Sequence, residues 1–198
     1  MLLHAFLIYG ENKMTTTTHI VAFSGSLRKS SFNTAAIKAA SQLMPDNCTL
    51  ELLDISDLPH YNQELDGDNP PKAVLALAQK VAKADAVLFA TPEYNYSVPG
   101  VLKNAIDWLS RQQPQPFSGK PAAIISASMS LFGGARAQYH LRQIMIYLDV
   151  HFVNKPEVMI AGAHEKFNDS GELEDELTRD FIKQLMDALV SWHHKLKS

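Results

Sequence analysis

The stretch IVAFSGSLRKSSFNT at residues 20–34 decides the fold class of this chain, because it joins an apolar segment to a helical one through serine and glycine. The apolar residues 20–23 predict a buried strand, and the residues from about Asn33 to Met44 have the apolar spacing of a helix. A strand that leads through a short loop into a helix is the repeating unit of parallel α/β sheets. Units of the same kind follow along the rest of the chain.

Short apolar runs alternate with segments of helical period from His19 to the C-terminus. The predicted strands cover residues 20–23, 49–53, 86–90, 122–126 and a fifth strand, 150–153 with 158–160, that is broken at Pro156. This strict alternation predicts an α/β fold with a five-stranded parallel sheet in a three-layer, doubly wound arrangement. We expect one domain over residues 19–198, with residues 1–18 as an extension outside its core.

Helices are predicted at about 33–44 and 72–83, after Pro99, just past Gly134 and near the C-terminus. The buried stripe of the last helix is predicted to consist of Phe181, Leu185, Ala188, Leu189 and Trp192. Sheets of this kind bind ligands outside the carboxyl ends of their strands. We therefore expect the functional residues in the loops after the first, third and fourth strands.

Composition and charge are those of an ordinary soluble domain, with 198 residues, 46% of them hydrophobic, and a net charge of −3. Residues 165–180 hold seven acidic and two basic residues, so the rest of the chain carries a net charge of +2. Without a basic run, a nucleic-acid partner is not expected, and the apolar residues 2–9 are too short for a membrane span. The single cysteine, Cys48, excludes an intrachain disulfide and indicates the cytoplasm, and the histidines lack the spacing of a metal site.

The loop after the first strand has the residues that a phosphate requires. Gly25 allows close approach, Arg28 supplies positive charge, and hydroxyl groups come from Ser24, Ser26, Ser30, Ser31 and Thr34. The alternative is simple helix capping by Ser31 or Asn33. The loop contains no G-x-G-x-x-G pattern, which disfavours a Rossmann dinucleotide site.

The other two loops suit a planar ring. TPEYNYSVPG at residues 91–100 combines two tyrosines, an amide and a proline turn, which favours a heteroaromatic ligand that needs stacking and edge hydrogen bonds. The alternative is a rigid turn whose tyrosines pack against the following helix. SASMSLFGG at residues 126–134 ends in paired glycines that can expose backbone N–H donors, although glycines are common at turns.

The motifs of these loops resemble the NADPH-dependent FMN reductase family, and within it the soluble bacterial chromate and quinone reductases. The resemblance rests on GSLR at 25–28 with Ser31 and Asn33, PEYNYSVPG at 92–100, LKNAIDW at 102–108, GGAR at 133–136, YHLRQ at 139–143 and NKPE at 154–157. It covers about residues 19–160. The resemblance implies a flavodoxin-like fold with strand order 2-1-3-4-5 and FMN bound at the three loops.

The resemblance also implies site residues. Those around the ribityl phosphate would be Ser26, Leu27, Arg28, Lys29, Ser30, Ser31, Phe32 and Asn33, with Arg28 as the charged partner. Those around the isoalloxazine would be Pro92, Glu93, Tyr94, Asn95, Tyr96 and Ser128, with the N–H of Gly133 near the N1/O2 edge. We expect Glu93 to fix its loop by a hydrogen bond rather than act as an acid or base, and the tyrosines to pack rather than donate protons.

In relatives, residues of the types found at Arg136, Tyr139 and Glu157 form a hydrogen-bonded network between subunits, so the resemblance implies a homodimer or homotetramer. One departure is Ser130, where some relatives carry glycine. Lys29 and Arg111 are candidate contacts for the 2′-phosphate that distinguishes NADPH from NADH.

The implied activity is that of an oxidoreductase in which the flavin N5 carries the chemistry and no side chain is catalytic. NADPH or NADH would deliver a hydride and leave, and a quinone, chromate, nitro or azo compound would then accept two electrons in a ping-pong cycle. The alternatives are a flavodoxin-type electron carrier and an FMN-binding redox sensor without turnover. The acidic residues are concentrated in the last loop and helix, which favours the enzyme over an acidic carrier.

Overall fold

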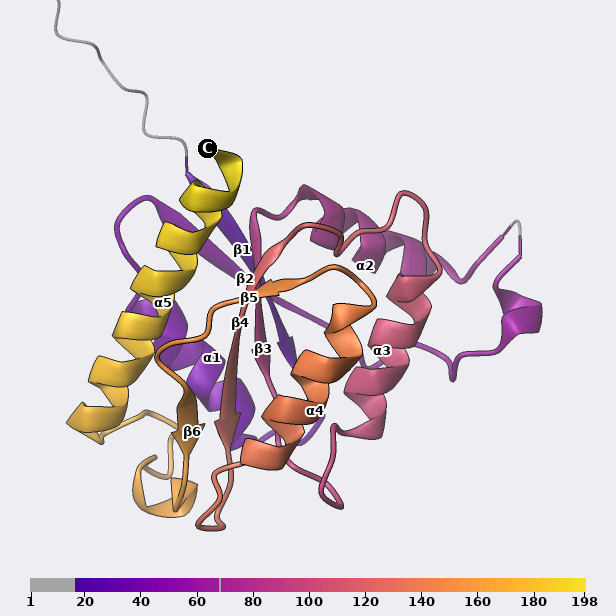
Figure 1. Ribbon diagram of the computed structural model, residues 1–198. Coiled ribbons are helices and arrows are strands. Elements are labelled where there is room, and N and C mark those ends of the chain that lie inside the picture. The colour runs from indigo at the N-terminus through magenta and orange to yellow at the C-terminus, as the bar shows by residue number, and fades with distance from the viewer. Residues whose placement is uncertain (1–16, 68) are drawn as a thin grey trace, which may run out of the picture.

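The computed structural model describes residues 17–67 and 69–198, and its centre is a parallel sheet (Figure 1). The strand order is β2-β1-β3-β4-β5, and β6 also pairs with β4. The strands are β1 (Thr18–Ser24), β2 (Cys48–Leu53), β3 (Ala86–Ala90), β4 (Pro121–Ala127), β5 (His151–Phe152) and β6 (Val158–Ile160). The predicted order 2-1-3-4-5 and the parallel pairing are confirmed.

Helices cover both faces of this sheet, as the alternation of the sequence predicts. They are α1 (Phe32–Gln42), α2 (Lys72–Lys83), α3 (Gly100–Ser110), α4 (Ala135–Ile146) and α5 (Glu176–Lys197), with two short 3-10 helices, η1 (Gln63–Leu65) and η2 (Ala163–Glu165). One face is packed by α1 and α5 and the other by α2, α3 and α4. No helix in the described part of the chain is long and apolar enough to cross a bilayer.

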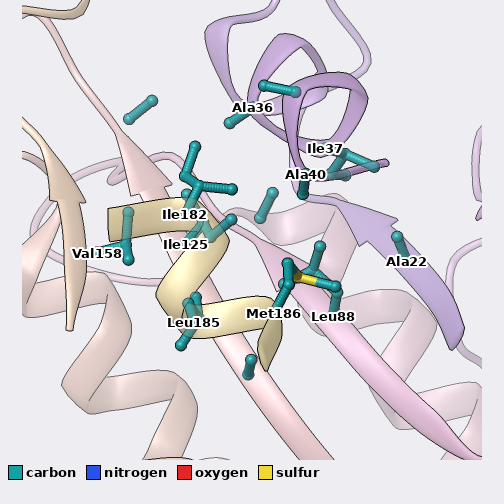
Figure 2. Close-up of a cluster of buried hydrophobic side chains, with 14 of the residues drawn as sticks. Ala22, Ala36, Ile37, Ala40, Leu88, Ile125, Val158, Ile182, Leu185 and Met186 are labelled. Atoms are coloured by element: carbon teal, nitrogen blue, oxygen red, sulfur yellow. The ribbon is translucent and has the colours of Figure 1, made fainter. Parts of the chain in front are cut away.

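The layer beneath α1 and α5 shows why these helices lie close to the sheet. Figure 2 shows small side chains of α1, including Ala36 and Ala40, directed toward the strands and toward α5. Ile182, Leu185 and Met186 of α5 fill the remaining space and are at most 1% exposed. Because β3 and β4 are buried along their whole length, their continuous apolar sequence is explained by helices on both faces.

The fifth strand position is divided, as expected from Pro156. Strand β5 pairs with Pro121 and Ala122 at the start of β4, whereas β6 pairs with residues 125–127 at its end. The residues between β5 and β6 leave the sheet. Strand β1 begins slightly earlier than expected, because Thr18 is buried and already pairs with Cys48 of β2. The rest of the expected extension, residues 1–16, lies outside the described residues.

The predicted buried stripe of α5 is confirmed at Leu185 and Leu189 and wrong at Phe181. The helix buries Thr178, Ile182, Leu185, Met186, Leu189 and His193, whereas Phe181 is 41% exposed. Both Phe181 and Ile182 are apolar, so helical periodicity alone fits either stripe. Packing on β4 and α1 selects the second one. Trp192 lies at the edge of the stripe, where its indole Nε1 donates to the carbonyl of His151 at 3.0 Å.

His193, near the end of α5, is only 5% exposed. Its Nδ1 donates to the carbonyl oxygen of Asp85 at 3.2 Å, and its Nε2 lies 3.6 Å from the Asp85 carboxylate. Lys197 donates to the same carboxylate at 2.8 Å. These contacts attach the end of α5 to the chain just before β3, at the edge of the sheet opposite the three loops.

Acid should weaken the fold partly through His193. Burial, followed by nearby Lys197, lowers the pKa of His193, although the carboxylate of Asp85 opposes this shift. Between the lowered pKa and the ordinary value of 6.5, the unfolded chain binds a proton that the folded chain excludes, so stability falls as the pH drops through this range. Urea unfolding at about pH 7.5 and about pH 5.5 should show a smaller acid-induced loss in His193→Gln than in the unsubstituted protein. The exposed neighbour gives a matched control, because His194→Gln should keep the full loss; equal losses in both variants would contradict this role of His193.

Candidate functional site

The three loops predicted to carry function meet at the carboxyl edge of the sheet, where the arrows of β4 and β6 end in Figure 1. They enclose a cavity of about 240 Å³. Its lining residues are Ser26, Arg28, Ser31, Phe32, Asn33, Pro92, Glu93, Tyr94, Ala127, Ser128 and Met129. The structure thus brings together nine of the expected site residues with Ala127 and Met129, which the sequence analysis missed. Both missed residues are apolar, and no polar motif marks them.

Six expected residues do not line this cavity. They are Leu27, Lys29, Ser30, Asn95, Tyr96 and Gly133. Lys29 and Ser30 line a neighbouring groove instead. Leu27 and Tyr96 are 52% and 67% exposed beside the cavity. Within the described residues, no group of three or more histidine, cysteine or carboxylate side chains is arranged to hold a metal.

The start of α1 has free donors for an anion. Ser31 is the N-cap, and its Oγ accepts from the N–H of Thr34 at 3.3 Å, so the capping interpretation is correct for Ser31. The N–H groups of Phe32 and Asn33 have no hydrogen-bond partner among the described residues, and the first turn of α1 contains no acidic residue. With the guanidinium of Arg28 beside them, these donors fit a phosphate.

Other polar groups of this loop are occupied within the protein. The hydroxyls of Ser24 and Thr34 bond to each other at 2.7 Å, which removes two of the five hydroxyls expected to face a phosphate. Gly25 is also explained by packing, since a Cβ there would lie 3.0 Å from Cδ of Pro92. The absent side chain lets the β3–α3 loop approach the β1–α1 loop.

The side chain of Asn33 connects two of the three loops. Its Nδ2 donates to the carbonyl of Ala127 at 3.0 Å, and its Oδ1 accepts from the N–H of the same residue at 2.9 Å. Asn33 is 3% exposed and lies 94 positions from Ala127 in the chain. The expected phosphate contact of Asn33 is therefore limited to its backbone N–H, because its amide holds the start of α1 to the end of β4.

The β3–α3 loop contains a tight two-residue turn. Tyr94 and Ser97 exchange backbone hydrogen bonds of 3.1 and 3.0 Å, and the residues between them, Asn95 and Tyr96, have φ of 50° and 66°. Asparagine tolerates this left-handed conformation, whereas a tyrosine there costs on the order of 1 kcal/mol. The ring of Tyr96 is held by the guanidinium of Arg136, 3.7 Å from the ring centre. Tyr96 therefore packs against α4 rather than against α3, the helix considered in the alternative interpretation.

Glu93 fixes its loop, as expected from the sequence. Its side chain is 8% exposed and pairs with the guanidinium of Arg136. Its Oε2 also accepts from the N–H groups of Arg136 at 3.1 Å and Ala137 at 3.4 Å. Helix α4 begins after Gly134, which has no side chain to cap it. The carboxylate from the β3–α3 loop thus serves as the cap of α4 and complements its dipole.

The N–H of Gly133, expected as a donor to the flavin edge, donates to the carbonyl of Ser130 at 3.3 Å in the structure. Gly133 has φ of 56°, and a Cβ there would lie 2.9 Å from the carbonyl carbon of Met159. The glycine is therefore required for close packing of the β4–α4 loop on β6. The hydroxyl of Ser128 accepts from the N–H of Ser130 at 3.1 Å, which fixes the loop beside the cavity.

Gln138 supports this loop and was missed by the sequence analysis. It is fully buried in α4, and its Nε2 donates to Ser126 Oγ and to the carbonyl of Val158, both at 2.8 Å. Ser126 Oγ in turn donates to the carbonyl of Gly133. A glutamine three positions before Leu141, on the apolar stripe of α4, is the signal that could have found it.

The three residues expected at a subunit interface do not form one network within the chain. Tyr139 donates to Glu157 at 3.3 Å, and this hydrogen bond raises the pKa of the tyrosine. Arg136 instead pairs with Glu93. Arg111, a candidate contact for a 2′-phosphate, lies at the far end of α3 and donates to Asp66 at 2.9 Å. The guanidinium of Arg111 is thus engaged away from the three loops, and its contact to a 2′-phosphate stays a prediction.

A doubly wound parallel sheet with a helix N-terminus, an arginine and an aromatic loop at its carboxyl edge defines the class of flavodoxin-like flavoproteins. The residues fit FMN, because the orphan N–H groups of α1 suit its phosphate and the adjoining cleft between Glu93, Tyr94 and Ser128 suits its ring.

Comparison with models of protein families identifies the kind of flavoprotein. Residues 18–165 match the model of the NADPH-dependent FMN reductase family, and the chain belongs to this family. It is thus an oxidoreductase that uses FMN and NAD(P)H, as the resemblance of its motifs implies.

Relatives agree over nearly the whole chain. The chain is 51% identical to an NAD(P)H-dependent FMN reductase of Pseudomonas aeruginosa over 93% of its length and 100% of that protein. It is 46% identical to an NADPH:quinone oxidoreductase of Arabidopsis thaliana over 90% of the chain and 93% of the relative. A solved structure, the NAD(P)H:acceptor oxidoreductase FerB of Paracoccus denitrificans, is 39% identical with a TM-score of 0.82, covering 90% of this chain and 98% of FerB.

Proposed function

We propose that this protein is an FMN-dependent NAD(P)H:quinone reductase with a ping-pong cycle. The observation that carries the proposal is the cavity at the carboxyl edge of the sheet, where the N–H groups of Phe32 and Asn33, unpartnered among the described residues, adjoin a cleft beside Tyr94. The Arabidopsis relative, 46% identical, is named for quinone reduction, which supports quinones as acceptors. Chromate, nitro and azo compounds are further proposed acceptors, because they too are electron-poor.

When bound, FMN supplies the redox chemistry, namely uptake of two electrons from NAD(P)H and their transfer to the acceptor. The protein residues bind and orient. Arg28 and the N–H groups at the start of α1 hold the phosphate, while Glu93 and Asn33 keep the three loops in place. Tyr94 is 51% exposed at the edge of the cavity, where its ring offers a flat surface to a planar acceptor.

Steady-state kinetics test this proposal. With NADPH and benzoquinone both varied, a ping-pong cycle predicts parallel lines in double-reciprocal plots, because the donor leaves before the acceptor binds. Intersecting lines would contradict the cycle, and absence of quinone turnover would leave a carrier or a sensor as the function. Repeating the assay with NADH measures the preference between the two donors.

The phosphate site is tested by Arg28→Ala, which should raise the dissociation constant of FMN about tenfold, since a charge-assisted hydrogen bond is lost at an exposed edge. Recovery of FMN fluorescence on dilution measures this constant. Arg179→Ala, a substitution of an arginine in α5, is the matched control and should leave it unchanged. If both variants bound FMN with equal affinity, Arg28 would not be a phosphate contact.

We also propose a homodimer or homotetramer. Large apolar side chains gather on α4 and the loops at its two ends, with Leu131 94%, Ile146 75% and Tyr147 87% exposed. Arg136, Tyr139 and Glu157 border them and are the proposed polar contacts. Light scattering should give two or four times the mass of one chain, and Leu131→Asp with Ile146→Asp should reduce it. A single-chain mass for the unsubstituted protein would contradict the assembly.

The single cysteine of the chain supports a cytoplasmic location as a further part of the proposal.

A further inference from the structure

A second and larger cavity, of about 550 Å³, lies next to the cavity that fits FMN. One wall comes from residues 28–38 of the β1–α1 loop and α1, and the other from residues 164–171 between β6 and α5. We call it the α1 groove. Arg28, Ser31 and Phe32 line both the α1 groove and the FMN cavity. A ligand that lies over the FMN cavity can therefore continue into the groove.

Four of the five ionisable side chains that line the α1 groove are basic. Arg28, Lys29, Lys38 and His164 line it, and Asp169 is the one acidic residue among its described lining residues. All four basic side chains are exposed, and His164 lies 3.6 Å from the carboxylate of Glu165. The groove therefore favours a ligand with negative charge, in addition to the phosphate assigned to the FMN cavity.

Two further carboxylates lie one hydrogen bond behind Asn168, a residue that lines the groove. Asn168 donates through Nδ2 to carboxylate oxygens of Glu172 at 3.1 Å and Glu174 at 3.0 Å. Neither glutamate lines the groove. The same loop is fixed by a hydrogen bond from the N–H of Gly171 to the carbonyl of Asn168 at 2.8 Å. These hydrogen bonds hold together the loop that forms the wall opposite α1.

Aromatic groups provide a surface for a planar base. The rings of Phe32 and Phe167 lie 5.6 Å apart between the two walls, and Phe167 is only 6% exposed. The guanidinium of Arg28 lies 5.7 Å from the ring centre of Phe32. A purine can pack against the partly exposed ring of Phe32 while an attached phosphate reaches the lysines.

We propose that the α1 groove binds the adenosine 2′-phosphate end of NADPH, with Lys29 and Lys38 as the phosphate contacts. This inference rests on the proposed reductase function, because it assigns a site to the donor of that reaction. NADPH and NADH differ only in the 2′-phosphate, so a cationic groove beside the FMN cavity would make the protein prefer NADPH. The expected assignment of Lys29 to the FMN phosphate is replaced by a contact to the second nucleotide.

Ligand binding tests the groove without turnover. Calorimetric titration of the FMN-loaded protein should give an affinity for 2′,5′-ADP about tenfold higher than for 5′-AMP, which lacks the 2′-phosphate. In the double variant Lys29→Ala, Lys38→Ala, the affinities for 2′,5′-ADP and 5′-AMP should become equal within about threefold. The double variant Lys29→Arg, Lys38→Arg should keep the difference between them. Lys183→Ala is the matched control, because this lysine lies on α5 and pairs with Asp187 outside the groove.

Two results would overturn the inference. One is an unchanged preference for 2′,5′-ADP in the double alanine variant. The other is inorganic phosphate that binds as tightly as 2′,5′-ADP and loses affinity in the same variant, since the groove would then be a site for free anions. Failure of the reductase function is distinguishable, because NADPH would then leave the flavin oxidised even where 2′,5′-ADP binding depends on both lysines.

Discussion

Replacing Asn33 with alanine should lower the free energy of unfolding by about 3 kcal/mol, because two buried hydrogen bonds are lost and both polar groups of Ala127 remain without a partner. For a domain of this size, the melting temperature should fall by about 6–12 °C. Since the same contacts hold the start of α1 to the end of β4, the dissociation constant of FMN should also rise about tenfold or more. Thermal unfolding of the FMN-free protein and fluorescence titration with FMN measure the two effects separately.

The matched control for this prediction is Asn154→Ala, a substitution of an exposed asparagine between β5 and β6 that should change neither quantity. Asn33→Asp keeps the acceptor for the Ala127 N–H but removes the donor, so its loss of stability should be intermediate. A melting temperature of Asn33→Ala equal to that of the control would show that Asn33 does not connect the loops.

Glu93→Ala should lower the free energy of unfolding by about 2–4 kcal/mol, because the carboxylate both caps α4 and pairs with Arg136 in a mostly buried position. Glu93→Gln keeps an acceptor for the N–H groups but loses the charge, so its cost should be about 1 kcal/mol. Hydrogen exchange locates the effect. The amides of Arg136 and Ala137 should exchange faster in Glu93→Ala, with little change in β1 or β3.

Glu176→Ala provides the comparison for Glu93, because Glu176 is 86% exposed and lies 3.8 Å from Arg179. Glu176→Ala should change the free energy of unfolding by no more than about 0.5 kcal/mol. If Glu93→Ala were no less stable than Glu176→Ala, the carboxylate would not be the cap of α4. A role of Glu93 as an acid or base would instead appear as an altered pH profile of turnover at unchanged stability.

The sequence predicts the sheet well because its central strands are buried on both faces. Residues 86–90 form β3 and residues 72–83 form α2 with the predicted bounds, and the fifth strand is divided at Pro156. These elements depend on local pattern alone, namely a continuous apolar run, a helical period and a proline. The position of the site also follows, because the loops after parallel strands meet at one edge of the sheet.

The errors concern residues whose partners lie far away in the chain. Asn33 and Gly25 have the composition of a phosphate loop, yet their surroundings show contacts to Ala127 and Pro92. Gly133 is explained by packing on β6, which the local sequence does not reveal. In α5, Phe181 and Ile182 both fit the helical period, and only packing on the sheet shows that Ile182 is the buried one.

Binding of FMN by the three loops, at a place where NADPH can reduce it, is tested most directly by the visible spectrum of the FMN-loaded protein under anaerobic conditions. We predict that NADPH abolishes the absorption of the oxidised flavin within the time of one turnover and that benzoquinone restores it. A bound flavin that keeps its oxidised spectrum in the presence of NADPH would contradict the account.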